Sequence, residues 1–261
     1  MGRIHLFELE DQPWFPKVIR DAGTAYLQFM AGRAGQSAAL APKIAEILRR
    51  NGETRIVDLC SGGSGPISDV VDILAANGEE VTATLTDLYP NLDAFERAER
   101  ESQGRVQAIR TPTDATRVGA ELPGLRTISN ALHHFRPEAA RRILQAAVDA
   151  RQPIAVFEMV GRAPIQILGI LLVFLPVMLA LPFLRPFRWS WVPLTYLIPI
   201  IPLFVTWDGF VSCLRVYSEE ELRALIEGIE GHEEYDWEIG EVPVGGMPIG
   251  IASMVGSPRA S

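Results

Sequence analysis

The sequence predicts an α/β fold, with a mostly parallel sheet of seven strands and helices on both of its faces. Three observations support this fold class. Short apolar runs typical of buried strands alternate with amphipathic helical runs between residues 53 and 158, as parallel strands joined by helical crossovers require. A glycine-rich turn connects the first of these strands to its helix. The chain has 261 residues and is 48% hydrophobic, which is enough for one large domain with an insertion.

Composition excludes several classes of partner and site. The formal net charge of −8 argues against a nucleic-acid partner, because no basic cluster is dense enough to replace the counterions of a phosphate backbone. Cys60 and Cys213 are the only cysteines, so we expect no disulfide framework, no zinc site and no metal requirement. Residues 1–11 become acidic too early for a signal peptide, which predicts a cytoplasmic catalytic domain.

Residues 1–52 are expected to form an N-terminal helical cap. A turn rich in aromatic residues precedes the first helix, and a second helix should cover residues 37–50 before Gly52 ends it. Trp14 and Phe15 either help to shape a substrate pocket or attach the cap to the core.

A glycine turn follows the first predicted strand, Ile56–Leu59. Residues 61–65 read Ser-Gly-Gly-Ser-Gly, and Pro66 suits the first position of a helix that continues to Leu74. A strand, an unobstructed turn and a helix start bring backbone N–H groups close to a ligand. The glycine spacing does not fit G-x-G-x-x-G, and no lysine follows the glycines, so neither a dinucleotide site nor a Walker-type ATP site is expected.

The stretch from Asp58 to Gly65 resembles motif I of the class I S-adenosyl-L-methionine-dependent methyltransferases, in which an acidic residue precedes G-x-G-x-G. Gly62 stands at the middle glycine, whereas Cys60 and Ser64 replace the first and third. The resemblance implies a Rossmann-like fold and S-adenosyl-L-methionine (SAM) as cofactor. It also implies a set of residues that bind the methionine end of SAM: Asp58, Cys60, Ser61, Gly62 and Gly63. The alternative is a plain strand–helix turn in another α/β protein.

Asp87 ends the second predicted strand, residues 81–86. A carboxylate at this strand tip can accept hydrogen bonds from both ribose hydroxyls of a nucleotide. The resemblance also places Leu88 beside the cofactor. Alternatively, Asp87 caps the helix that begins near Pro90.

Asp114 and Ala115 follow the third predicted strand, residues 105–110. The resemblance implies that Asp114 meets the exocyclic amine of adenine and that the Ala115 N–H meets a ring nitrogen. Taken alone, Asp114 fits a turn cap equally well. Three acidic residues at three successive strand ends nevertheless favour a shared adenosyl pocket.

The exits of the fourth and fifth predicted strands supply candidates for the chemistry. The resemblance implies that Asn130 and Ala131 approach the methionine part of SAM. His133 and His134 are candidate bases, because imidazole titrates near neutral pH; capping or packing are their alternative roles. Glu158 ends the fifth strand, residues 153–158, and could position an acceptor, act as the base or orient another side chain.

An apolar insert at residues 163–207 interrupts the α/β pattern. Ala163–Leu184 contains 22 residues without a charge and Trp191–Trp207 contains 17, with Arg185 and Arg188 between them. Only the first is long enough to span a bilayer. Aromatic residues near the segment ends suit a membrane interface. We expect the insert to dip into one leaflet or to form an apolar lid, rather than to cross the bilayer twice.

The position of the insert bears on the substrate. In the family that the sequence resembles, the segment after the fifth strand forms the roof of the substrate pocket. An apolar roof implies a hydrophobic small-molecule or lipid-like acceptor. Alternatively, the insert only anchors a protein whose substrate is soluble.

Residues 208–261 return to the α/β pattern. Ser218 and Glu221 predict a capping box at a helix start, and residues 234–242 and 249–255 predict the last two strands, the final one antiparallel. Three polar side chains could line the mouth of the pocket: Asp208, Ser212 and Arg215. The expected domains are the cap, the cofactor-binding half, the insert and the C-terminal part: 1–52, 53–162, 163–207 and 208–261.

Together these features predict a SAM-dependent methyltransferase that acts on a hydrophobic small molecule or lipid-like acceptor and associates with membranes through residues 163–207. A nicotinamide-dependent reductase would share the sheet, but the chain contains no Tyr-x-x-x-Lys pair. A membrane-anchored protein that binds a nucleotide-type ligand without catalysis is the other alternative.

Overall fold

The structure, a computed structural model, describes residues 2–246 and 250–259. Contacts group the chain into two compact units, each made of two segments. The sheet unit comprises Ala34–Met159 and Tyr217–Ser261, and the helical unit comprises Met1–Arg33 and Val160–Val216.

This grouping differs from the expected domains at two places. The second helix of the expected cap belongs to the sheet unit, because its apolar side packs on the sheet. Residues 208–216 belong to the helical unit together with the insert.

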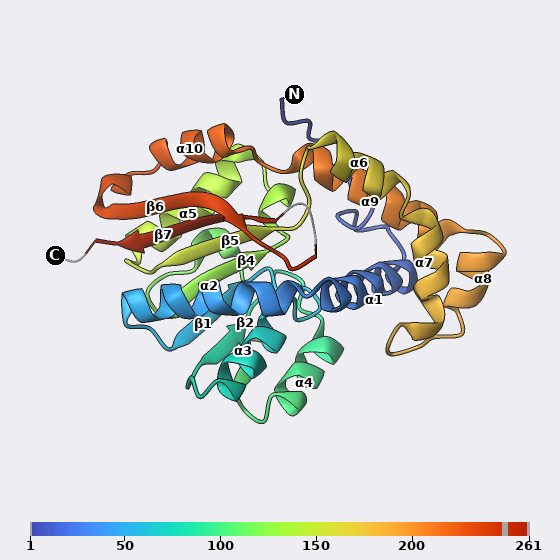
Figure 1. The fold of residues 1–261 in the computed structure, drawn as a ribbon, viewed down its shortest axis with the longest axis horizontal. Coiled ribbons are helices and arrows are strands. Elements are labelled where there is room, and N and C mark those ends of the chain that lie inside the picture. The colour runs from blue at the N-terminus through green and yellow to red at the C-terminus, as the bar shows by residue number, and fades with distance from the viewer. Residues whose placement is uncertain (1, 247–249, 260–261) are drawn as a thin grey trace. The chain divides into compact units, whose positions relative to one another are not determined.

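Seven strands form one sheet in the order β3-β2-β1-β4-β5-β7-β6 (Figure 1). The first five strands are parallel to their neighbours, whereas β7 is antiparallel to both β5 and β6. This arrangement confirms the predicted fold class. The strands are β1 (Arg55–Leu59), β2 (Thr82–Leu85), β3 (Val106–Ala108), β4 (Leu125–Ser129), β5 (Ile154–Glu158), β6 (Tyr235–Val242) and β7 (Ile251–Pro258).

The register of the parallel strands brings the candidate residues to one edge of the sheet. Asp58, near the end of β1, stands opposite Leu85 of β2 and Thr127 of β4. β3 is shorter than the predicted strand, and β7 continues beyond the predicted end to Pro258. The expected start of the last strand at residue 249 lies outside the described residues.

Helices cover both faces of the sheet (Figure 1). One face carries α2 (Gln36–Asn51), α3 (Ile67–Ala76) and α4 (Leu92–Glu101), and the other carries α5 (Pro137–Asp149) and α10 (Glu219–Glu227).

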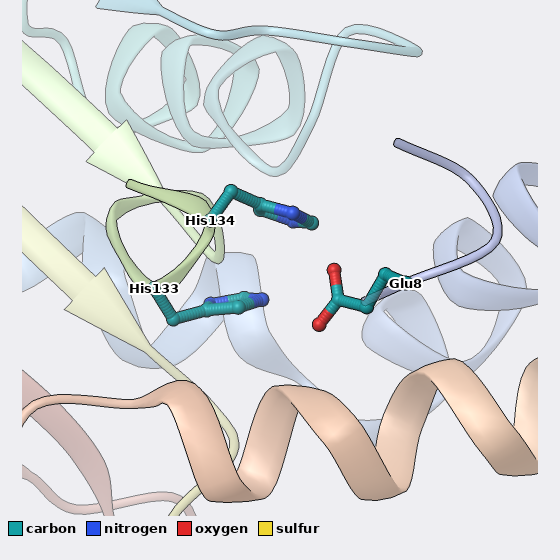
Figure 2. Close-up of side chains that lie close together, drawn as sticks. All are labelled: Glu8, His133 and His134. Atoms are coloured by element: carbon teal, nitrogen blue, oxygen red, sulfur yellow. The ribbon is translucent and has the colours of Figure 1, made fainter. Parts of the chain in front are cut away.

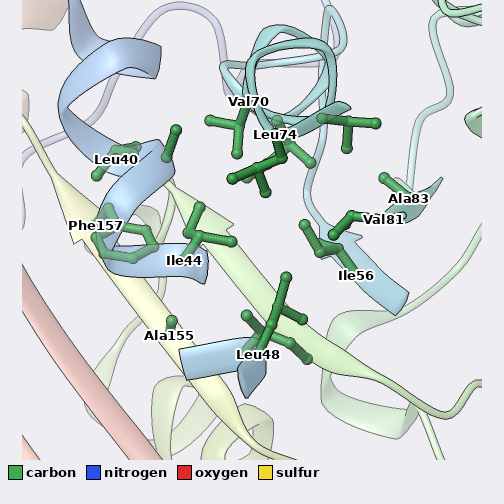
Figure 3. Packing of buried hydrophobic residues seen from close by; sticks show 14 of the residues in the cluster. Leu40, Ile44, Leu48, Ile56, Val70, Leu74, Val81, Ala83, Ala155 and Phe157 are labelled. Carbon is green, nitrogen blue, oxygen red and sulfur yellow. The ribbon is translucent and has the colours of Figure 1, made fainter. Parts of the chain in front are cut away.

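Apolar side chains of α2 and α3 interdigitate above the sheet (Figure 3). Leu40 and Ile44 of α2 pack with Val70 of α3 over Ile56 and Phe157 of the strands, and all five are essentially inaccessible to solvent. Apolar burial on this scale is the main stabilising contribution in a domain of this size.

Local signals set the helix ends close to their predicted places. Pro66 is the N-cap of α3 rather than its first residue, so the helix begins one position later than predicted. At α10 the capping box is confirmed: the Glu221 N–H donates to Ser218 Oγ at 3.2 Å, and the Ser218 N–H donates to Glu221 Oε2 at 2.8 Å.

Gly124, just before β4, lies very close to the backbone of the neighbouring strand β1. Gly124 has φ +137°, and a Cβ built there would lie 2.6 Å from the carbonyl oxygen of Arg55 in the neighbouring strand. We expect Gly124→Ala to lower the free energy of unfolding by about 3 kcal/mol, because backbone strain and overlap act together. Gly240→Ala is the control, since its Cβ would meet no atom within 4 Å. Equal urea midpoints for the two variants would contradict this expectation.

The helical unit has a small core of its own. Phe15 and Phe204 lie with ring centroids 4.7 Å apart, and the buried Trp191 donates its indole N–H to the Val18 carbonyl at 2.9 Å. Phe15 therefore belongs to this core, whereas Trp14 is 68% exposed. The helices of the unit are α1 (Lys17–Ala34), α6 (Pro164–Leu171), α7 (Phe174–Ala180), α8 (Trp191–Tyr196) and α9 (Ile200–Arg215).

Two full crossings of the bilayer were the alternative considered for the insert. Across residues 2–246 and 250–259, no single helix combines the length and apolar character needed to cross a bilayer. By length and composition alone, two bent pairs of helices meet the requirement, one of them being Pro164–Leu171 with Phe174–Phe183.

Asp208, Ser212 and Arg215 all lie on α9 and hold the N-terminal segment, and that they line a pocket mouth stays a prediction. The Asp208 carboxylate accepts the N–H groups of Leu9 and Glu10 at 2.8 and 2.9 Å. Ser212 Oγ donates to Glu8 Oε1, and the buried Arg215 guanidinium forms ion pairs with Glu8 and Asp11. A helix that continues past residue 207 turns these groups inward within the helical unit.

Candidate functional site

Left-handed backbone conformations shape the glycine turn after β1. Cys60 and Gly62 both adopt the left-handed conformation, with φ 58° and 52°. The Ser61 N–H donates to the Thr86 carbonyl at 2.9 Å, and Ser61 Oγ donates to the Asp58 carbonyl at 2.9 Å, so the turn is fixed to both strands. A Cβ at Gly62 would meet no atom within 4 Å, which leaves space beside the loop.

Asp87 joins the glycine turn to the end of β2. Its Oδ2 accepts the Gly62 N–H at 2.8 Å, and its Oδ1 accepts the Tyr89 N–H at 2.7 Å. The N-cap of α4 is Asn91, so the alternative that Asp87 caps this helix is wrong. Each carboxylate oxygen can accept a further hydrogen bond, which leaves capacity for a polar ligand. The following residue, Leu88, is 45% exposed.

Asp58 is buried under the turn. Its Oδ1 accepts the Thr127 hydroxyl at 2.6 Å, and only 2% of the residue is exposed. Burial raises the pKa of Asp58 to about 7, helped by the Asp87 charge and opposed by the hydrogen bond from Thr127. Sequence alone did not reveal Thr127, because only the register of β1 against β4 places it opposite Asp58.

The raised pKa of Asp58 has a consequence for stability. An unfolded Asp titrates near pH 4, so the folded state gains stability from a protonated Asp58 below that pH and loses it as the pH rises through about 7. In Asp58→Asn, which stays neutral, we expect this loss to be absent. The difference in unfolding free energy between wild type and variant should therefore change by up to about 4 kcal/mol across this window. Urea titrations at several pH values measure it, and parallel pH profiles would contradict the assignment.

Asp114 follows β3 and caps a short 3₁₀ turn, Ala115–Arg117. Its Oδ1 accepts the Thr116 N–H at 2.9 Å and the Thr116 hydroxyl at 2.7 Å. Desolvation acts to raise the pKa of Asp114, but the Thr116 hydrogen bonds and the Arg117 and Arg142 charges hold it below its ordinary value. The capping role is thus present, and it leaves Asp114 ionised; Ala115 beside it is buried.

The three acidic side chains all influence Cys60 in the glycine turn: after burial, the charges of Asp87, Asp58 and Asp114 raise the pKa of its thiol. Asp87 binds the turn directly and Asp58 is buried beside it, whereas Asp114 lies in the loop after β3. That the three share one adenosyl pocket stays a prediction.

Asn130 ties the end of β4 to the end of β5. It adopts φ 54°, its N–H donates to the Phe157 carbonyl at 2.7 Å, and its Oδ1 accepts the Met159 N–H at 2.8 Å. Ala131 is buried and forms the N-cap of the 3₁₀ turn Leu132–His134. These bonds fix the backbone that carries the two histidines.

His133 and Glu158 form a buried pair. Glu158 Oε1 accepts the His133 N–H at 3.1 Å, and Glu158 Oε2 lies 2.8 Å from His133 Nδ1. Both side chains are less than 10% exposed. The His134 ring lies beside that of His133, with centroids 4.3 Å apart (Figure 2). The carboxylate orients the His133 ring, and the tautomer that donates its Nδ1 proton to this carboxylate carries its lone pair on Nε2.

No family model and no curated protein sequence matches the chain. The solved structure of the plantazolicin methyltransferase BpumL in complex with SAH matches with TM-score 0.63 and 11% identity, covering 96% of this chain and 94% of that one. A putative O-methyltransferase from Nostoc punctiforme matches with TM-score 0.52 and 15% identity, covering 98% and 64%.

A third structure, the pyocyanin biosynthetic protein PhzM, matches with TM-score 0.51 and 18% identity and covers 85% of this chain. The chain spans 55% of the length of PhzM and 57% of the length of LaPhzM, another match. At 11% to 18% sequence identity, the similarity to these structures concerns the fold alone. Together with the order of the strands, it shows that the chain has the fold of the class I SAM-dependent methyltransferases.

Proposed function

We propose that the protein transfers a methyl group from SAM to a hydrophobic small-molecule acceptor. The observation that carries the proposal is the placement of two carboxylates at the glycine turn: Asp87 Oδ2 accepts the Gly62 N–H at 2.8 Å, and Asp58 is buried beside Ser61, whose Oγ donates to the Asp58 carbonyl. The likeness of the fold to methyltransferases supports it, and BpumL was solved with SAH.

The polar groups at this edge suit the hydrogen-bonding groups of SAM. Asp87 keeps acceptor capacity on both oxygens for ribose hydroxyls, and the space beside Gly62 admits a ligand close to the backbone. Asp114, held ionised, would accept from the adenine amine. Asp58, Cys60, Ser61, Gly63, Asn130 and Ala131 would surround the methionine end, and Leu88 and Ala115 the adenosine. When bound, SAM supplies an electrophilic methyl group.

The His133–Glu158 pair would remove a proton from the acceptor. His133 Nε2 takes the proton, and the Glu158 carboxylate at Nδ1 stabilises the imidazolium that results. Such a step matters only for an acceptor that must lose a proton, such as a hydroxyl. Otherwise the rate depends mainly on alignment of the reacting atoms. His134 packs on the pair and is a second candidate base.

The acceptor class rests on the segment that follows Glu158. Within six residues of this carboxylate the chain enters the uncharged stretch Ala163–Leu184. An uncharged segment that follows this carboxylate so closely in the chain suits an apolar acceptor better than a charged metabolite.

Calorimetric titration with SAM, SAH and NADH tests the proposal. We expect SAM and SAH to bind in the micromolar range or tighter and NADH not to bind. Tight binding of NADH instead would favour a reductase. Incubation with methyl-labelled SAM and a lipid extract then tests catalysis: label in a lipid-soluble product supports it, and SAM binding without any labelled product favours a non-catalytic binding protein.

A further inference from the structure

The insert presents large apolar side chains to solvent along consecutive helices. No residue of α6 is buried, and its only polar side chain is Gln166. α6 and α7 are bent by 50° at a short break, and across both of them five large side chains recur three or four residues apart, each 51% to 65% exposed: Ile165, Leu168, Leu172, Leu175 and Leu179.

These exposed side chains are distinct from the residues that form the core of the helical unit. Val177 and Ala180 of α7, followed by Leu181 and Leu184, are buried in the core that includes Trp191. α7 is therefore apolar on both sides. A helix exposed to water normally carries a polar face, so the outer side of this segment suits a non-aqueous environment.

The second apolar region also presents large side chains to solvent. Beyond Arg188, six large side chains are 37% to 80% exposed: Trp189, Tyr196, Leu197, Ile198, Ile200 and Leu203. No charged side chain lies among residues 189–207. An aromatic residue next to arginines, as Trp189 is, is typical of the region where lipid headgroups meet acyl chains.

Charge distinguishes a lipid surface from other occupants of this face. The helical unit contains eight Arg and Lys residues and five Asp and Glu residues, whereas the whole chain has a net charge of −8. The basic excess is therefore confined to the unit that carries these exposed apolar side chains. Arg185, between the two apolar stretches, is exposed. This combination complements anionic headgroups above acyl chains.

We propose that the exposed apolar side chains of α6 and α7 and of residues 189–203 dock the protein in one leaflet of a membrane that contains anionic lipid. An eight-residue helix such as α6 is about 12 Å long, whereas the hydrocarbon core of a bilayer is about 30 Å thick. The helices therefore lie within the interface, with Leu172 and Leu197 among the acyl chains and Arg185 at the headgroups.

Vesicle flotation of the whole protein tests this docking mode. The probes are vesicles of phosphatidylcholine and vesicles of equal parts phosphatidylcholine and phosphatidylglycerol. We expect the protein to float with both and to bind the anionic vesicles more tightly. Leu172→Glu and Leu197→Glu should each lower the partition coefficient about tenfold or more, because each places a charge where an aliphatic group would enter the acyl chains. Arg185→Gln should lower it about fivefold on anionic vesicles only.

Two control variants make the result specific. Leu92→Glu introduces the same charge at a 46% exposed leucine of α4, in the sheet unit, and should float like wild type. Leu172→Phe keeps an apolar side chain and should also float. Circular dichroism confirms that each variant is folded.

Three results would overturn the proposal. They are an absence of flotation with both vesicle types, unchanged flotation of both glutamate variants, and a lipid-free dimer that Leu172→Glu dissociates, which would mean that a second copy covers this face. SAM titration of the same variants separates this inference from the proposed function. Normal SAM binding without flotation would overturn only the docking, and flotation without SAM binding would overturn only the enzyme assignment.

Discussion

Asp87→Ala is expected to weaken SAM binding at least about 100-fold, because two hydrogen bonds to a charged carboxylate are each worth about 1.5–3 kcal/mol. Asp87 is the side chain at this edge whose two oxygens are both placed, by the Gly62 and Tyr89 N–H groups, beside the glycine turn. Isothermal titration of wild type and variant with SAM gives the ratio of the two dissociation constants.

Part of that loss would come from the loop itself, since the same carboxylate anchors the Gly62 N–H. Asp87→Asn retains one acceptor oxygen and should fall between alanine and wild type. Asp93→Ala removes an exposed acid from the first turn of α4 and controls for net charge. A dissociation constant for Asp87→Ala within about threefold of the Asp93→Ala value would refute the ribose assignment.

Glu158→Gln and His133→Ala are expected to lower kcat about 10²- to 10⁴-fold while leaving the SAM dissociation constant unchanged, provided that the acceptor loses a proton. Without the Glu158 carboxylate, neither the orientation of the His133 ring nor the charge on its imidazolium is stabilised. Initial rates of label transfer from SAM into lipid extract measure the effect.

The two alanine variants distinguish the candidate bases. Because Glu158 Oε2 lies 2.8 Å from His133 Nδ1, we expect the loss of rate in His133→Ala to exceed that in His134→Ala, at the neighbouring ring. Should the two alanine variants exchange these results, His134 would be the base instead.

Local patterns in the sequence were sufficient for most of the sheet unit. Alternating apolar runs located the seven strands to within a few residues, and the capping box at Ser218 depends only on neighbours in the chain. The acidic strand ends were predictable for the same reason: parallel strands place their carboxyl ends on one edge, whatever their exact lengths.

Contacts across long stretches of chain could not be predicted in this way. Asp58 and Thr127 meet because of the register of β1 against β4, and His133 receives Glu158 from a strand 25 residues later. The extent of α9 was missed because the apolar stretch that ends at Trp207 hides a helix that continues to Arg215. The absence of charge identified the insert, but only the structure separates its core residues from its exposed ones.

The helical unit is assembled from chain segments separated by more than a hundred residues. The Trp191 indole meets the Val18 carbonyl 173 residues away, and the Ile4 N–H donates to Leu214. During synthesis on the ribosome, Phe15 and Ile19 therefore emerge long before the residues that cover them. Until α9 is complete, this apolar surface of the nascent chain stays uncovered, and exposed apolar surface of this kind favours aggregation.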